Sequence, residues 1–310
     1  MTDHESKPAE PGIRESDSPP PLPPAWQPLT FRGVAAFSRA RIGRLLAVQW
    51  TVSLLVAAAV LWCLYLTWFQ RLPEAIRALP ATGTIENRVL SSPRASPEPL
   101  AADGFLAVSV NLEQSASRGS ASDVRVEFHR TDFILCSLLG CLRFDYPDRA
   151  LPFNQPELEA WWGAWQWTIY VSIVLGTVAF LFISWFVLAT VYAMPAWLTA
   201  YFKDRELSLP GSWKLAAAAV LTPALLMSAG LVFYAVNALD LLRLLLLWCL
   251  HVPLGWFYLY CAVLRLPVVV QATGRKSNPF GGAKEKKPEG EAKQNPFTSS
   301  KAGAGDVPLK

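Results

Sequence analysis

A charge-free apolar stretch in the second half of the chain constrains its fold more than any other feature. It runs from Trp167 to Val191, twenty-five residues without Asp, Glu, Lys or Arg. A helix rises about 1.5 Å per residue, so about 20 apolar residues cross the roughly 30 Å hydrocarbon core of a bilayer. Tyr192 and Trp197 follow this stretch, and four tryptophans crowd its start, as expected for rings that prefer the headgroup layer. The stretch therefore predicts a membrane-spanning helix.

Three further apolar stretches predict spans, at residues 45–69, 215–236 and 239–264. The first is longer than the apolar region of a cleaved signal peptide, which has about 7–15 residues, so we expect an uncleaved anchor. Pro223 lies inside the second, where it lacks the N–H that a helix interior needs, and this predicts a kink between Ala219 and Pro223. Asp240 and Arg243 lie one turn apart in the third, which predicts an ion pair near the membrane surface.

The composition agrees with membrane spans joined to polar segments. Hydrophobic residues make up 52% of the chain and charged residues 17%, whereas an ordinary soluble protein has about 25% charged residues. The net charge of +4 is too small to indicate nucleic acid as a partner. The bilayer is therefore the partner that the composition predicts.

The one long polar segment between spans, residues 70–160, predicts a small antiparallel β domain. Apolar and polar residues alternate over 106–112 and 123–128, and alternation with a period of two marks strands with one buried face. Residues 133–136 and 141–146 predict a hairpin joined by 137–140. Cys136 and Cys141 would face each other across this hairpin, which predicts a disulfide in an oxidising compartment; two reduced cysteines on a buried strand are the alternative.

Both ends of the chain have compositions typical of disorder, at residues 1–30 and 271–310. The first is rich in proline and could be a polyproline ligand or a solvated tail. The second contains Asn-Pro-Phe twice, at 278–280 and 295–297, either as docking motifs for a protein partner or as turns in a duplicated stretch.

Basic residues fix the predicted orientation. Residues 31–44 carry four arginines among apolar residues. They form either a surface helix on the cytoplasmic leaflet or simply the positive flank of the first span. The flank and the span together make up residues 31–69. Lysines and arginines also flank the cytoplasmic ends of the later spans, in 203–214 and 265–276. The positive-inside rule therefore predicts a multi-pass protein of the plasma (inner) membrane with both termini cytoplasmic and the β domain outside.

Signatures of catalysis and of cofactor binding are missing from the sequence. There are three histidines and no clustered His/Cys set, which argues against a transition-metal site, and no phosphate-cradling glycine motif. His129 lies near Asp123 and Asp132, so a serine could complete a hydrolytic triad, but a surface strand end is the simpler interpretation. We therefore expect no enzymatic activity and no cofactor.

His251 is the main candidate for an intramembrane polar site. It lies midway along the last span, where an ionisable side chain is costly and marks a functional-site candidate. It could instead donate or accept one hydrogen bond across a helix contact. Gln49 in the first span is a weaker candidate of the same kind.

The layout also resembles an uncharacterised family of bacterial inner-membrane proteins. The segment LPEAIRALPATGTIENRVL, residues 72–90, is similar to the turn and strand that these proteins carry after their first span. The resemblance implies one N-terminal span, an outer domain and a cluster of C-terminal spans over residues 161–270, and it implies no activity.

These observations predict an all-α polytopic membrane protein with four transmembrane helices and an extracytoplasmic β domain between helices 1 and 2. The expected function is non-enzymatic, with the outer domain binding a protein partner or an envelope component. The alternative is a small transporter or channel subunit, since helices broken by Pro223 and Pro253 beside a midplane histidine are how transporters build their sites.

Overall fold

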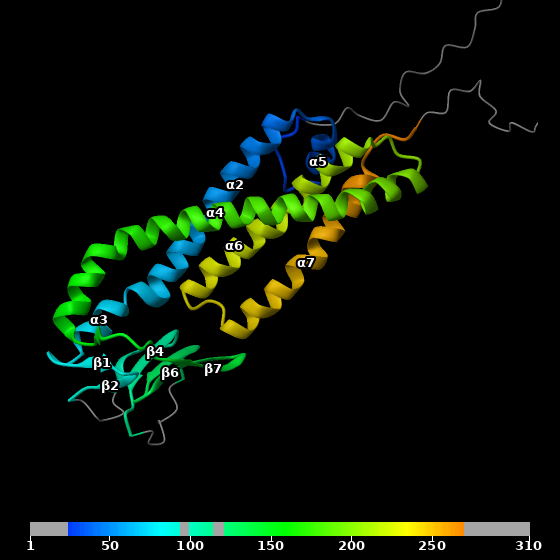
Figure 1. Ribbon diagram of the computed structural model, residues 1–310. Helices are drawn as coiled ribbons and strands as arrows, with labels where there is room; N and C mark the ends of the chain where they lie inside the picture. Colours follow the sequence, from blue (N-terminus) through cyan, green and yellow to red (C-terminus); the bar gives the residue numbers. More distant parts are fainter. Residues whose placement is uncertain (1–23, 94–98, 114–120, 270–310) are drawn as a thin grey trace, which may run out of the picture. The chain divides into compact units, whose positions relative to one another are not determined.

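The computed structural model describes residues 24–93, 99–113 and 121–269 (Figure 1). The predicted disordered tails fall almost wholly outside these residues, including most of the proline run and both Asn-Pro-Phe triplets. Only residues 24–30 of the predicted N-terminal tail are described, and they pack against the helices.

Among the described residues, four helical stretches are long and apolar enough to cross a membrane. They are α2 (Ile42–Leu64), which continues as a π-helical turn over Tyr65–Phe69, α4 (Gln155–Phe202), the pair α5 (Leu209–Ala219) and α6 (Leu221–Ala235), and α7 (Leu241–Leu264). The four predicted spans are therefore present as helices.

Helix α4 is much longer than the predicted span. Its 48 residues extend over about 72 Å, more than twice the thickness of a hydrocarbon core. Pro195 lies inside it without ending it, and residues 192–202, which follow the predicted span, are part of the same helix. Asn154 caps its start by accepting a hydrogen bond from the N–H of Glu157 at 3.1 Å.

The predicted break near Pro223 is confirmed. Helix α5 ends at Ala219, Val220 lies outside both helices, and α6 begins at Leu221. Because Pro223 has no N–H, the carbonyl of Ala219 loses its helical partner, and the chain turns at that point.

The connection between α6 and α7 is a tight helical hairpin, as the sequence predicts. Asn237 takes a left-handed conformation, φ 60°, and its N–H donates to Tyr234 O while that of Ala238 donates to Phe233 O. This is the Schellman pattern that ends helices. Asp240 then caps α7 through the N–H of Arg243 at 2.7 Å, and the predicted Asp240–Arg243 pair forms at 3.4 Å.

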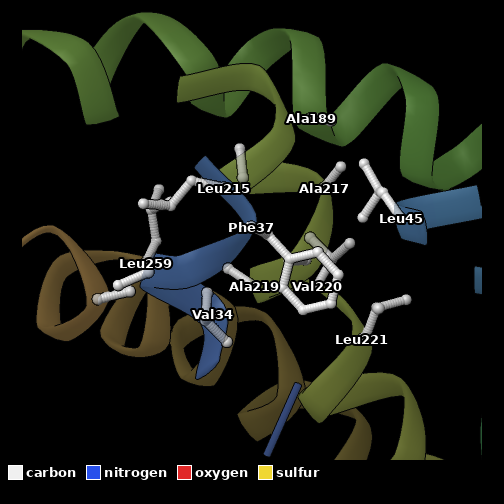
Figure 2. Close-up of a cluster of buried hydrophobic side chains, with 14 of the residues drawn as sticks. Val34, Phe37, Leu45, Ala189, Leu215, Ala217, Ala219, Val220, Leu221 and Leu259 are labelled. Atoms are coloured by element: carbon white, nitrogen blue, oxygen red, sulfur yellow. The ribbon is translucent and has the colours of Figure 1, made fainter. Parts of the chain in front are cut away.

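The core of the helical part lies around α5. The run Leu215–Ala219 is completely buried, because small side chains let neighbouring helices approach closely. Phe37 fills the space beside Ala219 and Val220, and Leu45 of α2, Ala189 of α4 and Leu259 of α7 surround the same cluster (Figure 2).

The N-terminal segment is an integral part of this core. Helix α1 (Phe31–Ala36) and the 3₁₀ turn Phe37–Arg39 pack against α5 and α7, with Val34, Ala35 and Phe37 fully buried. Thr222 donates a hydrogen bond to Pro28 O at 2.6 Å. The segment is thus buried between helices, and the expectation of a surface helix on the leaflet does not describe it.

The β domain follows α2 through helix α3 (Leu72–Arg77). A three-stranded sheet has the order β2-β1-β8, and a five-stranded sheet has the order β3-β4-β5-β6-β7. The strands are β1 (Thr84–Glu86), β2 (Val89–Ser91), β3 (Pro99–Ala102), β4 (Leu106–Val110), β5 (Val124–Phe128), β6 (Asp132–Ser137), β7 (Gly140–Asp145) and β8 (Leu151–Pro152).

The predicted strands are present, but the domain is not wholly antiparallel. Strands β4 and β5 pair in parallel, with Leu106 opposite Val124 and Val110 opposite Phe128. Residues 111–123 connect them, and a connection of a dozen or more residues is long enough to bring the chain back to the starting edge. Strands β5, β6 and β7 are antiparallel, and Cys136 and Cys141 are joined by the predicted disulfide.

Candidate functional site

An apolar cavity of about 250 Å³ lies between the five-stranded sheet and the helices that lead into the spans. Helix α3 contributes Ala75 and Ile76, strand β4 contributes Leu106 and Val108, and strand β5 contributes Val126 and Phe128. Every lining residue is Ala, Val, Leu, Ile, Phe or Trp. An apolar cavity of about 150 Å³ already holds a small hydrocarbon, so this one has room for a longer apolar group.

The cavity has a closed end and an accessible end. Ile76, Leu106 and Val108 are buried, whereas Val126 and Phe128 are only half-buried and Trp161 of α4 is 49% exposed. Indole rings favour the interfacial layer of a bilayer. Because Trp161 lies in the first turns of α4, the accessible end lies next to the start of a helix that is long and apolar enough to span a membrane.

An ion pair joins the residue before α3 to the loop between β3 and β4. Arg71, just before α3, donates from Nε to Asp103 Oδ2 at 2.7 Å and also contacts Glu74 at 3.0 Å. Hydrogen bonds from these carboxylates raise the pKa of the Arg71 guanidinium. Burial disfavours the Asp103 carboxylate, but hydrogen bonds from the Leu106 N–H, Arg71 and the Phe105 N–H outweigh it, so the pKa of Asp103 lies below its usual value.

A second contact joins the domain to the helical hairpin. Phe105 is buried and packs edge to face on Tyr234 of α6, with ring centroids 5.1 Å apart. The Tyr234 hydroxyl donates to Asp123 Oδ2 at 2.8 Å. Phe105 and Asp123 both lie at the end of the sheet where β4 and β5 begin, so this end of the sheet faces the α6–α7 turn.

A cluster of buried polar side chains lies in the five-stranded sheet. The Nδ1 of His129 is 3.1 Å from Asp132 Oδ1, and its Nε2 is 3.5 Å from Glu127 Oε1. Asn111 donates to the same Glu127 oxygen at 2.8 Å. Tyr146 donates to the His129 carbonyl at 2.9 Å, and burial raises the pKa of its phenol.

This arrangement gives His129 a role in holding the sheet together. Both of its ring nitrogens face carboxylate oxygens, so neither is free to accept a proton from a serine hydroxyl. Asp123, the other carboxylate of the hydrolytic hypothesis, is bonded to Tyr234 instead. The geometry offers no support for a hydrolytic triad among the described residues.

His251 lines a second hollow, of about 260 Å³, between α4, α6 and α7. Its Nδ1 is hydrogen-bonded to the Trp248 carbonyl of its own helix. Ser184 of α4 and Ser228 of α6 line the same hollow, among aliphatic and aromatic side chains. The histidine therefore lies beside a mainly apolar hollow whose lining includes three hydroxyl-bearing residues, Ser184, Ser228 and Tyr192.

The structure does not bring Gln49 to His251. Gln49 is buried on α2, and it is not one of the residues that line the hollow, which α2 reaches only at Val56, two turns further along. Among the described residues, no group of three His, Cys, Asp or Glu side chains could hold a metal ion.

The cavity residues were missed as a site by sequence reasoning for a definable reason. The alternation of Val124, Val126 and Phe128 indicates a buried face, but not that helix α3 would lie opposite it and leave space between.

No protein-family model matches the chain, and no significant match was found among curated proteins or solved structures. The suspected resemblance to bacterial inner-membrane proteins stays a prediction.

Proposed function

We propose that this chain is a non-enzymatic, multi-pass protein of the plasma (inner) membrane whose β domain binds an apolar envelope component, namely the acyl chain of a lipid. The observation that carries the proposal is the apolar cavity between α3 and strands β4 and β5. An aliphatic chain is the ligand that such a lining suits, because it needs no hydrogen-bonding partner. The position of Trp161 beside the accessible end supports entry from the bilayer surface.

The proposed orientation has both termini in the cytoplasm and the β domain outside. Three basic side chains lie together at the helix ends that are remote from the β domain. Lys214 donates to Ala40 O at 2.8 Å and Arg205 donates to Leu266 O at 2.7 Å. Arg39 pairs with Glu206 at 2.7 Å. The positive-inside rule favours the cytoplasm for that end. The disulfide supports an oxidising compartment for the β domain.

Labelling of intact cells tests the orientation. The three free cysteines, Cys63, Cys249 and Cys261, are first replaced by serine. Arg149→Cys in the β domain and Lys203→Cys after α4 are then compared with a membrane-impermeant maleimide. We expect labelling at position 149 in intact cells and at position 203 only after permeabilisation, and the reverse pattern would contradict the orientation.

A photo-crosslinkable lipid tests the acyl-chain site. The protein is reconstituted in nanodiscs with a phospholipid that carries a diazirine near the end of one chain, and crosslinked peptides are mapped by mass spectrometry. We expect crosslinks in α3 and β5, and we expect Ala75→Leu, which extends into the cavity, to reduce them. The matched control is Ala78→Leu, because Ala78 follows Ala75 by about one helical turn and is not part of the cavity lining.

The reduction must be specific for the proposal to stand. If Ala75→Leu and Ala78→Leu gave the same crosslinks in α3 and β5 as the unchanged protein, the cavity would not be a lipid site. Crosslinks confined to the spans would lead to the same conclusion, since a lipid held only around the helices does not enter the β domain.

A small transporter or channel subunit is the second candidate, because His251, Ser184 and Ser228 share one hollow next to the break at Pro223. A charged, water-soluble thiol reagent tests it. Under this function, His251→Cys in a background without Cys63, Cys249 and Cys261 should react through a wet pathway. A separate variant that keeps Cys249, exposed on the same helix, and lacks Cys63 and Cys261 is the control, and it should not react if Cys249 faces lipid. An unreactive position 251 would argue against a water-filled path.

A further inference from the structure

The hairpin of β6 and β7 carries apolar residues where turns usually carry polar ones. Ser137 is paired with Gly140, and Leu138 and Leu139 form the turn between them. These leucines are 52% and 84% exposed, and Leu142 on β7 is 62% exposed. Short hairpin turns favour Asn, Asp and Gly, whose conformations and polar groups suit water. The exposed leucines indicate that this tip meets an apolar environment.

The tip lies at the level of a membrane-spanning helix. Ser137 and Leu138 line one hollow together with Asp240, Leu241 and Leu242, the first residues of α7. Leu242 is itself 54% exposed on a helix apolar enough to span a bilayer. The tip therefore lies beside the first turn of α7, as the neighbouring ends of β7 and α7 in Figure 1 illustrate.

Charge is distributed along the hairpin as a bilayer surface requires. The ten residues from Phe133 to Leu142 contain no charged side chain, and the first charge on β7 is Arg143. Leu139 and Arg143 are four positions apart, about 13 Å along a strand. The interfacial layer on each side of the hydrocarbon core is about 5–8 Å thick, so Leu139 can reach the acyl chains while Arg143 stays among the headgroups.

From these observations we propose that the tip of the β6–β7 hairpin, Leu138 and Leu139 with Leu142 behind them, inserts into the leaflet that borders the β domain. The Cys136–Cys141 disulfide joins the two strands at the second residue pair below the turn and keeps the hairpin paired. Insertion would fix the sheet at the membrane surface independently of any lipid in the apolar cavity. The proposal requires only that α7 spans the membrane, and it does not depend on which leaflet is cytoplasmic.

Fluorescence quenching in nanodiscs tests the insertion. Leu139→Cys, made without the three free cysteines and with the disulfide verified by mass, is labelled with a nitrobenzoxadiazole dye. Asp148→Cys, in the exposed loop beyond β7, is the matched control. We expect nitroxide-labelled phospholipid to quench the dye at position 139 and not at 148, and aqueous iodide to do the opposite. A second labelled variant, Leu142→Cys, should be quenched by lipid less strongly than Leu139→Cys.

Two outcomes would overturn the proposal. Iodide quenching at position 139 equal to that at 148 would place the tip in water. Protection of position 139 from both quenchers would mean that protein covers it, either a second copy or another chain. To exclude an effect of the dye, unlabelled Leu138→Asp/Leu139→Asp is compared with the unchanged protein by hydrogen exchange, and we expect faster exchange confined to β6 and β7.

Discussion

Replacing His129 by leucine should destabilise the β domain, because it leaves two carboxylates buried in one place. His129, Glu127 and Asp132 are each less than one-tenth exposed, and the imidazole lies between the two acids at 3.1 and 3.5 Å. Removing the partner of a buried carboxylate leaves that group without compensation, which costs about 3–5 kcal/mol. Asn111 still donates to Glu127 at 2.8 Å and Arg143 still lies 3.9 Å from Asp132, so we expect the low end, about 3 kcal/mol.

Hydrogen exchange of β4, β5 and β6 in nanodiscs measures this loss locally. A loss of about 3 kcal/mol speeds exchange through opening by about 100-fold, since every 1.4 kcal/mol is a factor of ten. The control is Arg130→Leu, the exposed neighbour, which should leave exchange unchanged. Adding Asp132→Asn to His129→Leu removes one of the two charges and should recover part of the protection.

The result that would refute this reasoning is a small effect of the single change. If His129→Leu speeds exchange by less than about tenfold, the loss is below 1.4 kcal/mol, and the two acids do not depend on the histidine. The same holds if Asp132→Asn gives no recovery in the His129→Leu background, because the repulsion between the carboxylates is the source of the expected cost.

Three further predictions concern the elements around the sites. The pKa of Asp103 lies below its usual value, so its ion pair with Arg71 stabilises the folded state above about pH 4 and is lost as pH falls further; acid titration of unfolding should show that loss in the unchanged protein and not in Asp103→Asn. Asn237→Val forces a β-branched residue into φ 60° and should lower the unfolding free energy by about 1–2 kcal/mol, whereas Asn237→Gly should not. Gly33→Ala places a Cβ against the carbonyl oxygen of Gln27, closer than van der Waals contact allows, so limited proteolysis should cut the N-terminal segment of that variant faster than in the unchanged protein.

The four long apolar helices could be predicted from the sequence because each signal is local. A charge-free run such as Trp167–Val191 indicates its own helix, since no other structure satisfies its backbone inside lipid. Pro223 breaks its helix for a reason contained in one residue, and the Asp240–Arg243 pair follows from the helical repeat. The hairpin and its disulfide are equally local, because five positions separate Cys136 from Cys141.

Features that depend on distant partners were decided only by the tertiary structure. The alternation in Val124–Phe128 indicates a strand but not its neighbour, so the parallel pairing of β4 with β5 could not be predicted. Glu127 belongs to the polar side of that pattern, yet it is buried. The folded chain brings His129 and Asn111 into contact with its carboxylate.

The two proposed lipid contacts also combine features that the sequence determines locally with features that only the tertiary structure decides. The leucines of the hairpin turn can be read from the sequence, but their exposure and their place beside the start of α7 cannot. The apolar cavity is a space that no single segment contains, since α3 and α4 must lie across the sheet without filling the gap. Sequence patterns report which side chains avoid water, whereas the packing of separate elements decides whether those side chains meet one another, a cavity or the bilayer.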